Sequence, residues 1–207
     1  NFKGANKSAI RLEGGNNIKL SDSEINFSGE NGLLSLEVSD LLVERSNIND
    51  TYNNALYLRY GNDNAIIRDN VISNTALIAG RTQNEDAAGI GIFAYGDNIL
   101  VRNNHVINSG FNGIQFNGNY TTVKNNFVDK FCQIKGDGGG IYTFGGVQYQ
   151  GYKGRKIQGN IVINSMGSEG GIPDKGINYK PLAEGIFLDD HSNNIEITEN
   201  TVGNIRN

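Results

Sequence analysis

A single phrase returns along the whole chain, and it restricts the possible folds more than any other feature of the sequence. Each copy has branched apolar residues at alternate positions, then a small polar pair that most often ends in Asn, then a second short apolar segment. The copies are NNIKLSDSEI, SDLLVERSNI, DNAIIRDNVISN, DNILVRNNHVIN, YTTVKNNFVDK, RKIQGNIVIN and NNIEITENTVGN. Alternation indicates short β-strands, and regular return of the phrase indicates the coils of a solenoid.

Two sets of residues give the register of these coils. The polar residues before the last strand are Ser23, Asn47, Asn70, Asn104, Asn126, Asn160 and Asn200, with steps of 24, 23, 34, 22, 34 and 40 residues. A second strand starts at Ile10, Leu34, Leu56, Ile90, Ile114, Ile141 and Ile186. The shortest step is a bare coil, and the longer steps contain insertions.

The repeat favours one solenoid class. Leucine-rich repeats need a fixed run of Leu, and helical repeats need apolar residues three and four apart; this chain has neither pattern. Val and Ile at alternate positions, with Gly or Asn at the corners, predict an all-β, right-handed parallel β-helix of about seven to eight coils. We expect residues 1–207 to form one domain. The repeat still runs at NIEITENTVGN, so we also expect a segment of a longer protein.

The charge and composition of the sequence exclude some classes of binding partner. The net charge is −4, and no stretch interleaves Lys or Arg with aromatic residues, so the sequence predicts no extended basic face and no nucleic-acid partner. It also contains no apolar run long enough for a membrane span. Cys132 is the single cysteine, and we expect a small buried apolar residue rather than a nucleophile. The many Asn residues are expected to stack at corners.

The insertions indicate which face of the solenoid has a function. Three of them, at 75–88, 129–138 and 165–183, occupy the same corner, before the strands that begin with Gly-Ile. A fourth, at 145–155, follows one of these strands. Since the core fixes the length of a bare coil, extra length serves something outside it. The loops therefore predict a walled groove over the Gly-Ile strands.

Alternation predicts which side chains form the floor of this groove. If Ile90, Ile114 and Ile141 point inward, their neighbours point outward, in columns that also include Ser35 and Gly91. The predicted substrate-binding residues are Phe93, Gln115, Asn117, Tyr142, Phe144, Phe187 and Arg59. Exposed aromatic rings beside amides and charged groups suit sugar rings and hydroxyls, although aromatic ladders also stabilise sheets through cross-strand contacts.

Acidic residues gather at the same edge in the C-terminal half. The predicted catalytic residues are Asp137, Glu184, Asp189, Asp190 and His191. Asp137 and Glu184 lie on successive coils, which places them about 5–10 Å apart and fits the paired carboxyls of either class of glycosidase. Ordinary solvated turn acids remain the alternative. The same oxygens suit Ca²⁺ at Asp137, Asp189 and Asp190.

Elimination from a uronate would instead need a base and a group that neutralises the sugar carboxylate. The candidates by position are Tyr142, His191, Lys135, Arg59, Lys175 and Lys180. Acids outnumber these bases at the edge, so hydrolysis is narrowly favoured.

The segments DGGGIYTFGG, RKIQGNIVIN and EGIFLDDHSNNIEITENTV resemble the right-handed parallel β-helix superfamily of carbohydrate-active proteins, which includes pectate-lyase-like folds, polysaccharide lyases, epimerases and glycoside hydrolases. The resemblance implies an extracellular or surface protein, often bacterial, that binds a polysaccharide across the helix and sometimes needs Ca²⁺. We therefore expect a polysaccharide-active enzyme. The alternative is a noncatalytic adhesin, stalk or carbohydrate-binding protein.

Overall fold

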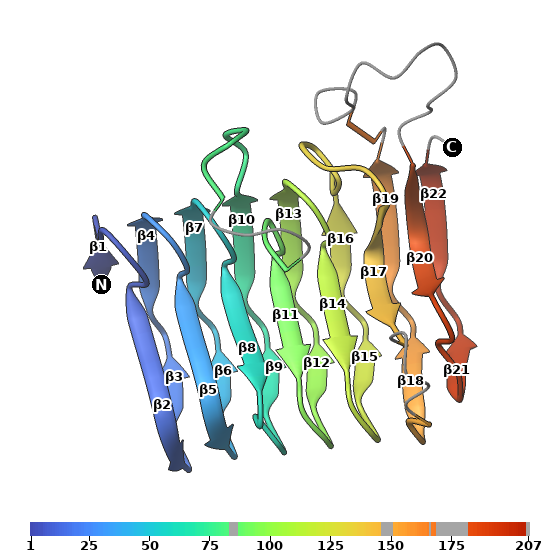
Figure 1. Cartoon of the computed structure of the whole chain (residues 1–207), viewed down its shortest axis with the longest axis horizontal. Coiled ribbons are helices and arrows are strands. Elements are labelled where there is room, and N and C mark those ends of the chain that lie inside the picture. Colours follow the sequence, from blue (N-terminus) through green and yellow to red (C-terminus); the bar gives the residue numbers. More distant parts are fainter. Residues whose placement is uncertain (83–86, 146–150, 166, 169–181, 206–207) are drawn as a thin grey trace.

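The chain passes through three parallel sheets in turn, one strand of each in every coil (Figure 1). The computed structural model describes residues 1–82, 87–145, 151–165, 167–168 and 182–205. All strand pairs are parallel, and non-consecutive strands pair throughout, for example β10 with β7 and β13. The predicted all-β parallel β-helix is confirmed.

Sheets A and C form two faces of the solenoid. Sheet A contains β1 (Phe2–Lys3), β4 (Glu24–Ser28), β7 (Asn47–Thr51), β10 (Val71–Thr75), β13 (His105–Ser109), β16 (Phe127–Asp129), β19 (Ile161–Ser165) and β22 (Thr201–Ile205). Sheet C contains β3 (Lys19–Ser21), β6 (Leu42–Glu44), β9 (Ile66–Arg68), β12 (Leu100–Arg102), β15 (Thr122–Lys124), β18 (Arg155–Gln158) and β21 (Ile195–Thr198).

Sheet B forms the third face, toward the viewer in Figure 1. It contains β2 (Ile10–Asn16), β5 (Leu33–Ser39), β8 (Leu56–Tyr60), β11 (Ile92–Tyr95), β14 (Ile114–Asn117), β17 (Gly138–Phe144) and β20 (Ala183–Asp189). These are the strands that the sequence assigns to the floor of the groove.

Left-handed backbone positions set the length of each coil outside sheet B. Three residues per coil, five apart, have a positive φ, as at Asn98, Asn103 and Asn108 with φ of 58°, 55° and 58°. The same spacing holds at 17/22/27, 40/45/50, 64/69/74, 120/125/130, 154/159/164 and 194/199/204. Asn, Asp and Gly tolerate this region best, which explains their abundance. Because these segments never change length, all insertions fall on the sheet B side.

A ladder of buried amides runs along the corner between sheets C and A. Asn104 Nδ2 donates to Asn126 Oδ1 at 3.0 Å, and Asn126 Nδ2 donates to Asn160 Oδ1 at 3.0 Å. Asn70 and Asn200 extend the ladder in both directions. The predicted register is confirmed there but wrong at Asn47: Ser46 occupies the ladder and its Oγ accepts from the N–H of Ser23, because Arg45 takes the positive φ.

In sheet B, the predicted register differs from the observed one on two coils. Ile114 aligns with Ile92, not Ile90, and Leu56 aligns with Leu33, not Leu34. Ser35, predicted to point outward, is fully buried, and its Oγ donates to Asn62 Oδ1 at 2.6 Å. A polar residue fits inside because this partner satisfies it. The alternation of Leu34 and Leu36 therefore gives the wrong face.

Glycines let sheets A and B approach closely at their common corner. A Cβ on Gly91 would lie 2.5 Å from Val106 Cγ1, and one on Gly113 would lie 2.4 Å from Val128 Cγ1. Gly91 therefore faces the core, although its place in the sequence predicts an outward position. The close contact explains the repeated Gly-Ile pair: the glycine lies at the corner between the sheets, and the side chain of the residue after it is buried in the core.

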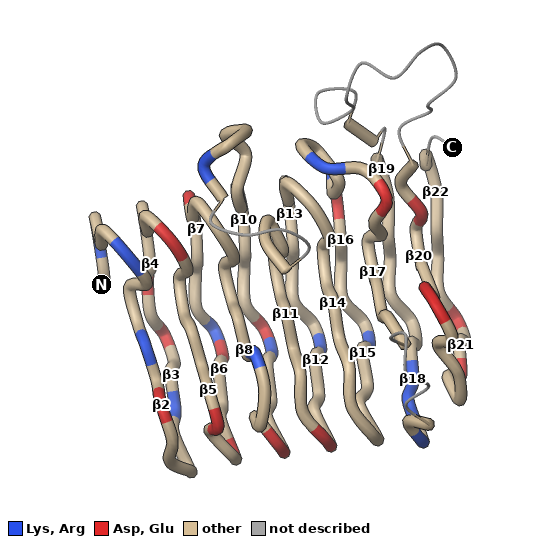
Figure 2. The backbone as a smooth tube through the Cα atoms, in the orientation of Figure 1, with Lys and Arg blue, Asp and Glu red and all other residues tan. Residues whose placement is uncertain are grey.

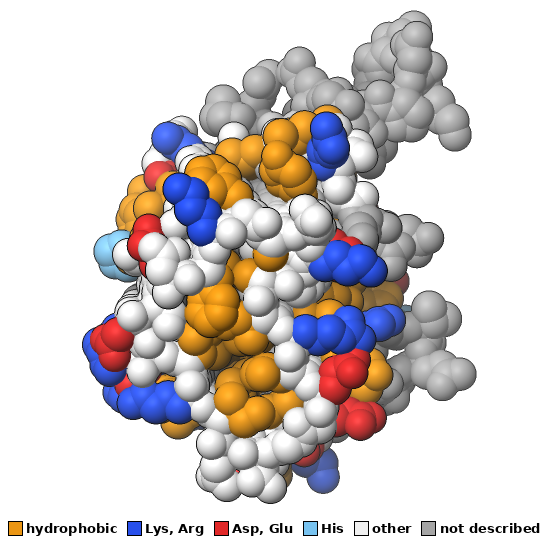
Figure 3. Space-filling model, turned by 90° about the vertical axis from the view of Figure 1, so that its left-hand side faces the viewer, with side chains coloured by type: hydrophobic (Ala, Val, Ile, Leu, Met, Phe, Trp, Pro, Cys, Tyr) orange, Lys and Arg blue, Asp and Glu red, His pale blue; other side chains and the backbone are white. Residues whose placement is uncertain are grey.

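Apolar side chains fill the core, and among the described charged residues Glu44 and Arg155 are buried. Figure 3 looks along the solenoid from its N-terminal end, where apolar side chains fill the centre and charged ones lie around the rim. Figure 2 shows that positions of Lys, Arg, Asp and Glu are spread along the length of the solenoid among the described residues. Within the described ranges, no helix is long and apolar enough to cross a membrane.

Candidate functional site

A pocket of about 430 Å³ opens over the C-terminal half of sheet B. Its lining combines five aromatic rings with two amides, one ammonium group and two carboxylates: Phe93, Tyr95, Phe111, Tyr142, Phe144, Gln115, Asn117, Lys135, Asp137 and Asp189, with Ala87 and Gly136. Rings of this kind pack against the C–H faces of a sugar, while the polar groups can bond its hydroxyls. The pocket lies where the sequence places the groove.

The Asp189 carboxylate is fixed by two donors. The Tyr142 hydroxyl donates to Oδ2 at 2.6 Å, and the N–H of Asp190 donates to Oδ1 at 2.8 Å. Tyr142 is itself held by the ring of Phe187, which packs edge-on at 5.4 Å between centroids. Strand pairing of β17 with β20 brings these residues together across 47 positions of sequence. The result is a preorganised carboxylate on the pocket wall.

The carboxyl of Glu184 has a raised pKa. Burial raises the pKa of its carboxyl, and the charges of Asp137 and Asp189 raise this pKa further. Its Oε2 is buried and makes no hydrogen bond. A carboxyl in this state retains its proton at a higher pH than an ordinary glutamate does. Raised pKa values of this kind occur in general acids, although structural networks also produce them.

The insertion at 129–138 forms one wall of the pocket. Lys135 Nζ donates to the carbonyl oxygen of Ala88 at 3.0 Å and lies 5.2 Å from the centre of the Phe111 ring. These contacts tie the insertion to the end of the preceding one. Cys132 lies beneath this wall, fully buried. Burial raises the pKa of its thiol, as do the charges of Glu184 and Asp137, so it is no nucleophile at neutral pH.

The amides on the floor have fixed orientations. Gln115 Oε1 accepts from Asn112 Nδ2 at 2.9 Å, and Asn117 Oδ1 accepts from Thr143 Oγ1 at 2.7 Å. In both side chains the oxygen is engaged by a neighbouring residue, and the bond fixes the orientation of the amide group. Amides that are already fixed in orientation lower the entropic cost of binding a ligand.

The structure gathers seven of the predicted site residues around this pocket and leaves five outside its lining. The seven are Phe93, Gln115, Asn117, Tyr142, Phe144, Asp137 and Asp189. Phe187 supports Tyr142 from outside the lining, and Glu184 is coupled to the pocket through the charges of Asp137 and Asp189. Asp190 and His191 are exposed in the turn after β20, and Arg59 lines a neighbouring pocket.

The predicted Ca²⁺ ligands are only partly assembled. Asp137 and Asp189 share the pocket, whereas Asp190 does not line it. Among the residues that the structure describes, no group of three or more His, Cys, Asp and Glu could hold a metal. Ca²⁺ at Asp137, Asp189 and Asp190 stays a prediction. Lys175 and Lys180 lie outside the described residues.

A second pocket, of about 410 Å³, lies over the N-terminal half of sheet B. Arg11, Arg59 and Tyr57 line it together with Glu30, and Ala87 borders both pockets. The Tyr57 and Phe93 rings meet edge-on at 5.1 Å along the same face. The two pockets thus follow one another along sheet B, with arginines at one end and carboxylates at the other.

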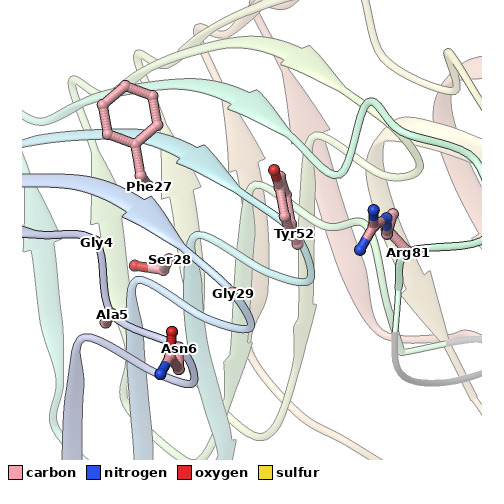
Figure 4. A pocket seen from close by; sticks show the side chains of 8 residues that line it. All are labelled: Gly4, Ala5, Asn6, Phe27, Ser28, Gly29, Tyr52 and Arg81. Atoms are coloured by element: carbon pink, nitrogen blue, oxygen red, sulfur yellow. The ribbon is translucent and has the colours of Figure 1, made fainter.

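A third hollow, of about 400 Å³, lies at the N-terminal end of the sheet A side (Figure 4). In this view Tyr52 stands between Phe27 and Arg81, and the Arg81 guanidinium lies 6.0 Å from the Tyr52 ring. Phe27 and Tyr52 are 51% and 38% exposed. Among the described residues that line this hollow there is no acid.

Sequence reasoning missed Tyr95, Phe111 and Ala87 as lining residues. Ala87 lies in an insertion and Phe111 in the short corner before β14, and both positions are outside the strands whose alternation predicts orientation. Tyr95 was missed because the register of β11 is displaced by two residues from the expected one. The aromatic residue three positions after Ile92 was the available signal.

The first 128 residues match the family described as "Right handed beta helix region". The chain belongs to this family. The match covers more than half of the sequence and agrees with the three parallel sheets. No curated protein has a significantly similar sequence.

Two solved structures are similar to this right-handed β-helix. An alginate lyase from Paenibacillus sp. strain FPU-7 is 14% identical, over 95% of this chain and 78% of that one, with a TM-score of 0.49. The Dettilon tailspike protein is 15% identical, over 96% of this chain and 48% of that one, with a TM-score of 0.43. At these identities both are likenesses of fold.

Proposed function

We propose that the protein is a polysaccharide-active enzyme, a glycoside hydrolase, that binds a glycan chain along sheet B. One observation carries the proposal: Glu184, a carboxyl with a raised pKa, is electrostatically coupled to Asp137, which lines an aromatic pocket. Glycoside hydrolysis needs two carboxyls in unequal protonation states, one to give a proton and one to accept it or attack.

The residues divide the reaction as follows. Glu184, whose carboxyl has a pKa raised by burial, donates its proton to the glycosidic oxygen as that bond breaks. The Asp137 carboxylate attacks the anomeric carbon or removes a proton from the water that does so. Asp189, fixed by Tyr142, supplies negative charge near the oxocarbenium ion of the transition state. Phe93 and Tyr142 hold the ring, and Gln115 and Asn117 bond its hydroxyls.

Several features support hydrolysis over elimination. Tyr142 acts as a donor to Asp189, which suits a positioning role better than that of a base. His191, the other predicted base, lies in an exposed turn outside the pocket lining. Of the described lining residues, Lys135 is a cation, whereas Asp137 and Asp189 are both acids. The proposed setting is extracellular or at the cell surface, where long polysaccharides occur.

A noncatalytic carbohydrate-binding protein is the second candidate. The observation that favours it is that Glu184 does not line the pocket among the described residues, so its proton would have to reach the glycan by a movement of the side chain. In that case the aromatic floor binds the sugar, and the acids only shape the surface.

The decisive experiment incubates the wild-type protein with a panel of neutral and acidic polysaccharides and measures reducing ends. Glu184→Gln and Asp137→Asn are expected to lower turnover at least 100-fold, since each removes acid–base catalysis. Asp190→Asn is the matched control, because Asp190 is exposed and outside the pocket. Unsaturated uronate ends, seen by ultraviolet absorbance, would mean a lyase; binding without new ends on every substrate would mean a binder.

A further inference from the structure

Sheet C carries a row of cations that the functional site does not use. On its outward face, Arg68, Arg102 and Lys124 pair with one another across neighbouring strands β9, β12 and β15. The blue segments of these strands follow one another in Figure 2. Neighbouring strands are about 4.8 Å apart, so the three positive charges form a line parallel to the solenoid axis.

Arg68, at one end of this row, is neutralised, whereas Arg102 and Lys124 have no ion pair among the described residues. Arg68 pairs with Glu44 on the preceding coil and lies 3.9 Å from Asp69. Past the other end, Lys156 pairs with Glu196 at 3.0 Å. Like charges that face each other directly on adjacent strands destabilise a sheet. A bound anion would remove this repulsion.

An apolar column lies beside the cations. Two residues earlier on the same strands, and therefore on the same face, stand Ile66, Leu100 and Thr122. Ile66 is 37% exposed. The two columns together give a strip in which the cations lie beside two aliphatic residues and one threonine.

We propose that this strip of sheet C is a second binding surface, for an acidic polysaccharide chain. Its carboxylates would pair with Arg102 and Lys124, and the C–H faces of its rings would pack on Ile66 and Leu100. The inference stands on sheet C alone and does not depend on catalysis at sheet B. The cations lie 34 and 22 residues apart in the sequence, so only the coiling brings them together.

The chemistry of the strip favours an acidic glycan over nucleic acid. Single-stranded nucleic acid needs aromatic side chains on which bases stack, and neither outward column of sheet C contains one in its described strands. Two unneutralised cations flanked by aliphatic side chains suit a chain of sugar rings that carries carboxylates and presents C–H faces.

The test measures binding of polygalacturonate, with dextran as the neutral glycan, by titration calorimetry at several salt concentrations. The double variant Arg102→Gln/Lys124→Gln removes both proposed carboxylate-binding cations. The matched control, Lys7→Gln/Lys153→Gln, removes two exposed Lys charges elsewhere, so both proteins carry the same net charge. Folding of both is checked by circular dichroism.

The double variant is expected to bind polygalacturonate about 3- to 30-fold more weakly, because each exposed ion pair contributes modestly. Its dependence of log K on log salt is expected to be shallower by about 1 to 2. The control should match the wild type in both. Equal binding by the double variant and the control would overturn the proposal, as would equal losses on single-stranded DNA or on phosphatidylserine vesicles. Turnover in the sheet B assay should not change in the double variant, which separates this surface from the proposed hydrolase site.

Discussion

Replacing Asn126 by alanine tests the buried amide ladder that aligns the coils. The Asn126 side chain is 2% exposed and makes four hydrogen bonds. Its Oδ1 accepts from the N–H and from Nδ2 of Asn104, both at 3.0 Å, and its Nδ2 donates to the Val101 carbonyl at 3.1 Å and to Asn160 Oδ1 at 3.0 Å.

The expected loss follows from which partners keep another bond. Asn104 Nδ2 retains two carbonyl acceptors, and Asn160 Oδ1 retains the N–H of residue 126. The N–H of Asn104 loses its acceptor, and a buried donor without a partner costs about 1–3 kcal/mol. The other lost bonds add about 1 kcal/mol in total. Asn126→Ala should therefore lower the free energy of unfolding by about 3 kcal/mol.

The assay is urea denaturation followed by far-ultraviolet circular dichroism, with the slope checked for constancy between variants. Asn16→Ala is the control, because Asn16 is exposed and its oxygen accepts one bond from Asn17. Surface changes of this kind usually alter stability by less than about 0.5 kcal/mol. If Asn126→Ala and Asn16→Ala have the same small effect, the ladder does not hold the coils together and the reasoning is wrong.

Three further predictions concern stability. The Glu44 side chain is 1% exposed and pairs with three cations, and a hydrogen bond from Lys19 is the main cause that lowers the pKa of its carboxyl to about 2. The stability that Glu44 contributes is therefore present above the ordinary pKa of 4.5 and is lost as pH falls toward 2. Over this window the thermal midpoint of Glu44→Gln should fall less than that of the wild type. Gly113→Ala should lower the free energy of unfolding by about 1–3 kcal/mol in urea, because the new Cβ would meet Val128 Cγ1 at 2.4 Å; an unchanged midpoint would refute the close corner. Because the pKa of the Glu184 carboxyl is raised, the wild type should lose stability relative to Glu184→Gln as pH rises through that pKa. In thermal melts well below pH 4.5 the two proteins should have the same midpoint. A Glu184→Gln protein that is less stable than the wild type at neutral pH would contradict the raised pKa.

The sequence predicts the winding of the chain because repetition averages out local ambiguity. The ladder residues from Asn70 to Asn200 are identified correctly, since every copy of the phrase demands the same left-handed corner before a buried amide. Where one coil departs from the phrase, the prediction slips: Ser46 replaces an amide, and Asn47, one position on, is taken for it.

The orientation of sheet B is harder to predict because its strands have no such marker. In GLLSL, three Leu surround Ser35, and alternation alone gives two equally good faces. In the structure Ser35 faces the core, because Asn62, 27 residues later, provides a hydrogen-bond acceptor for its hydroxyl. A β-bulge between Ser35 and Leu36 then places Leu36 opposite Tyr60, so Arg59 leaves the expected column. Such pairings depend on contacts between coils that no local pattern contains.

The candidate site shows the same division. The sequence places Asp137, Tyr142 and Asp189 at this pocket because they lie in or next to strands whose position the repeat determines. The coupling of Glu184 to its neighbours and the donor role of Tyr142 depend on side-chain geometry and burial, which spacing does not determine.

The most direct test of a glycan site on sheet B is a crystal structure of the Glu184→Gln protein with a bound oligosaccharide from the polysaccharide that the wild type cleaves. We expect sugar rings against Phe93 and Tyr142, with a hydroxyl or glycosidic oxygen within hydrogen-bond distance of Asp137 and of residue 184. Sugar density that avoids sheet B altogether, with the carboxylates of Asp137 and Asp189 untouched, would contradict the account.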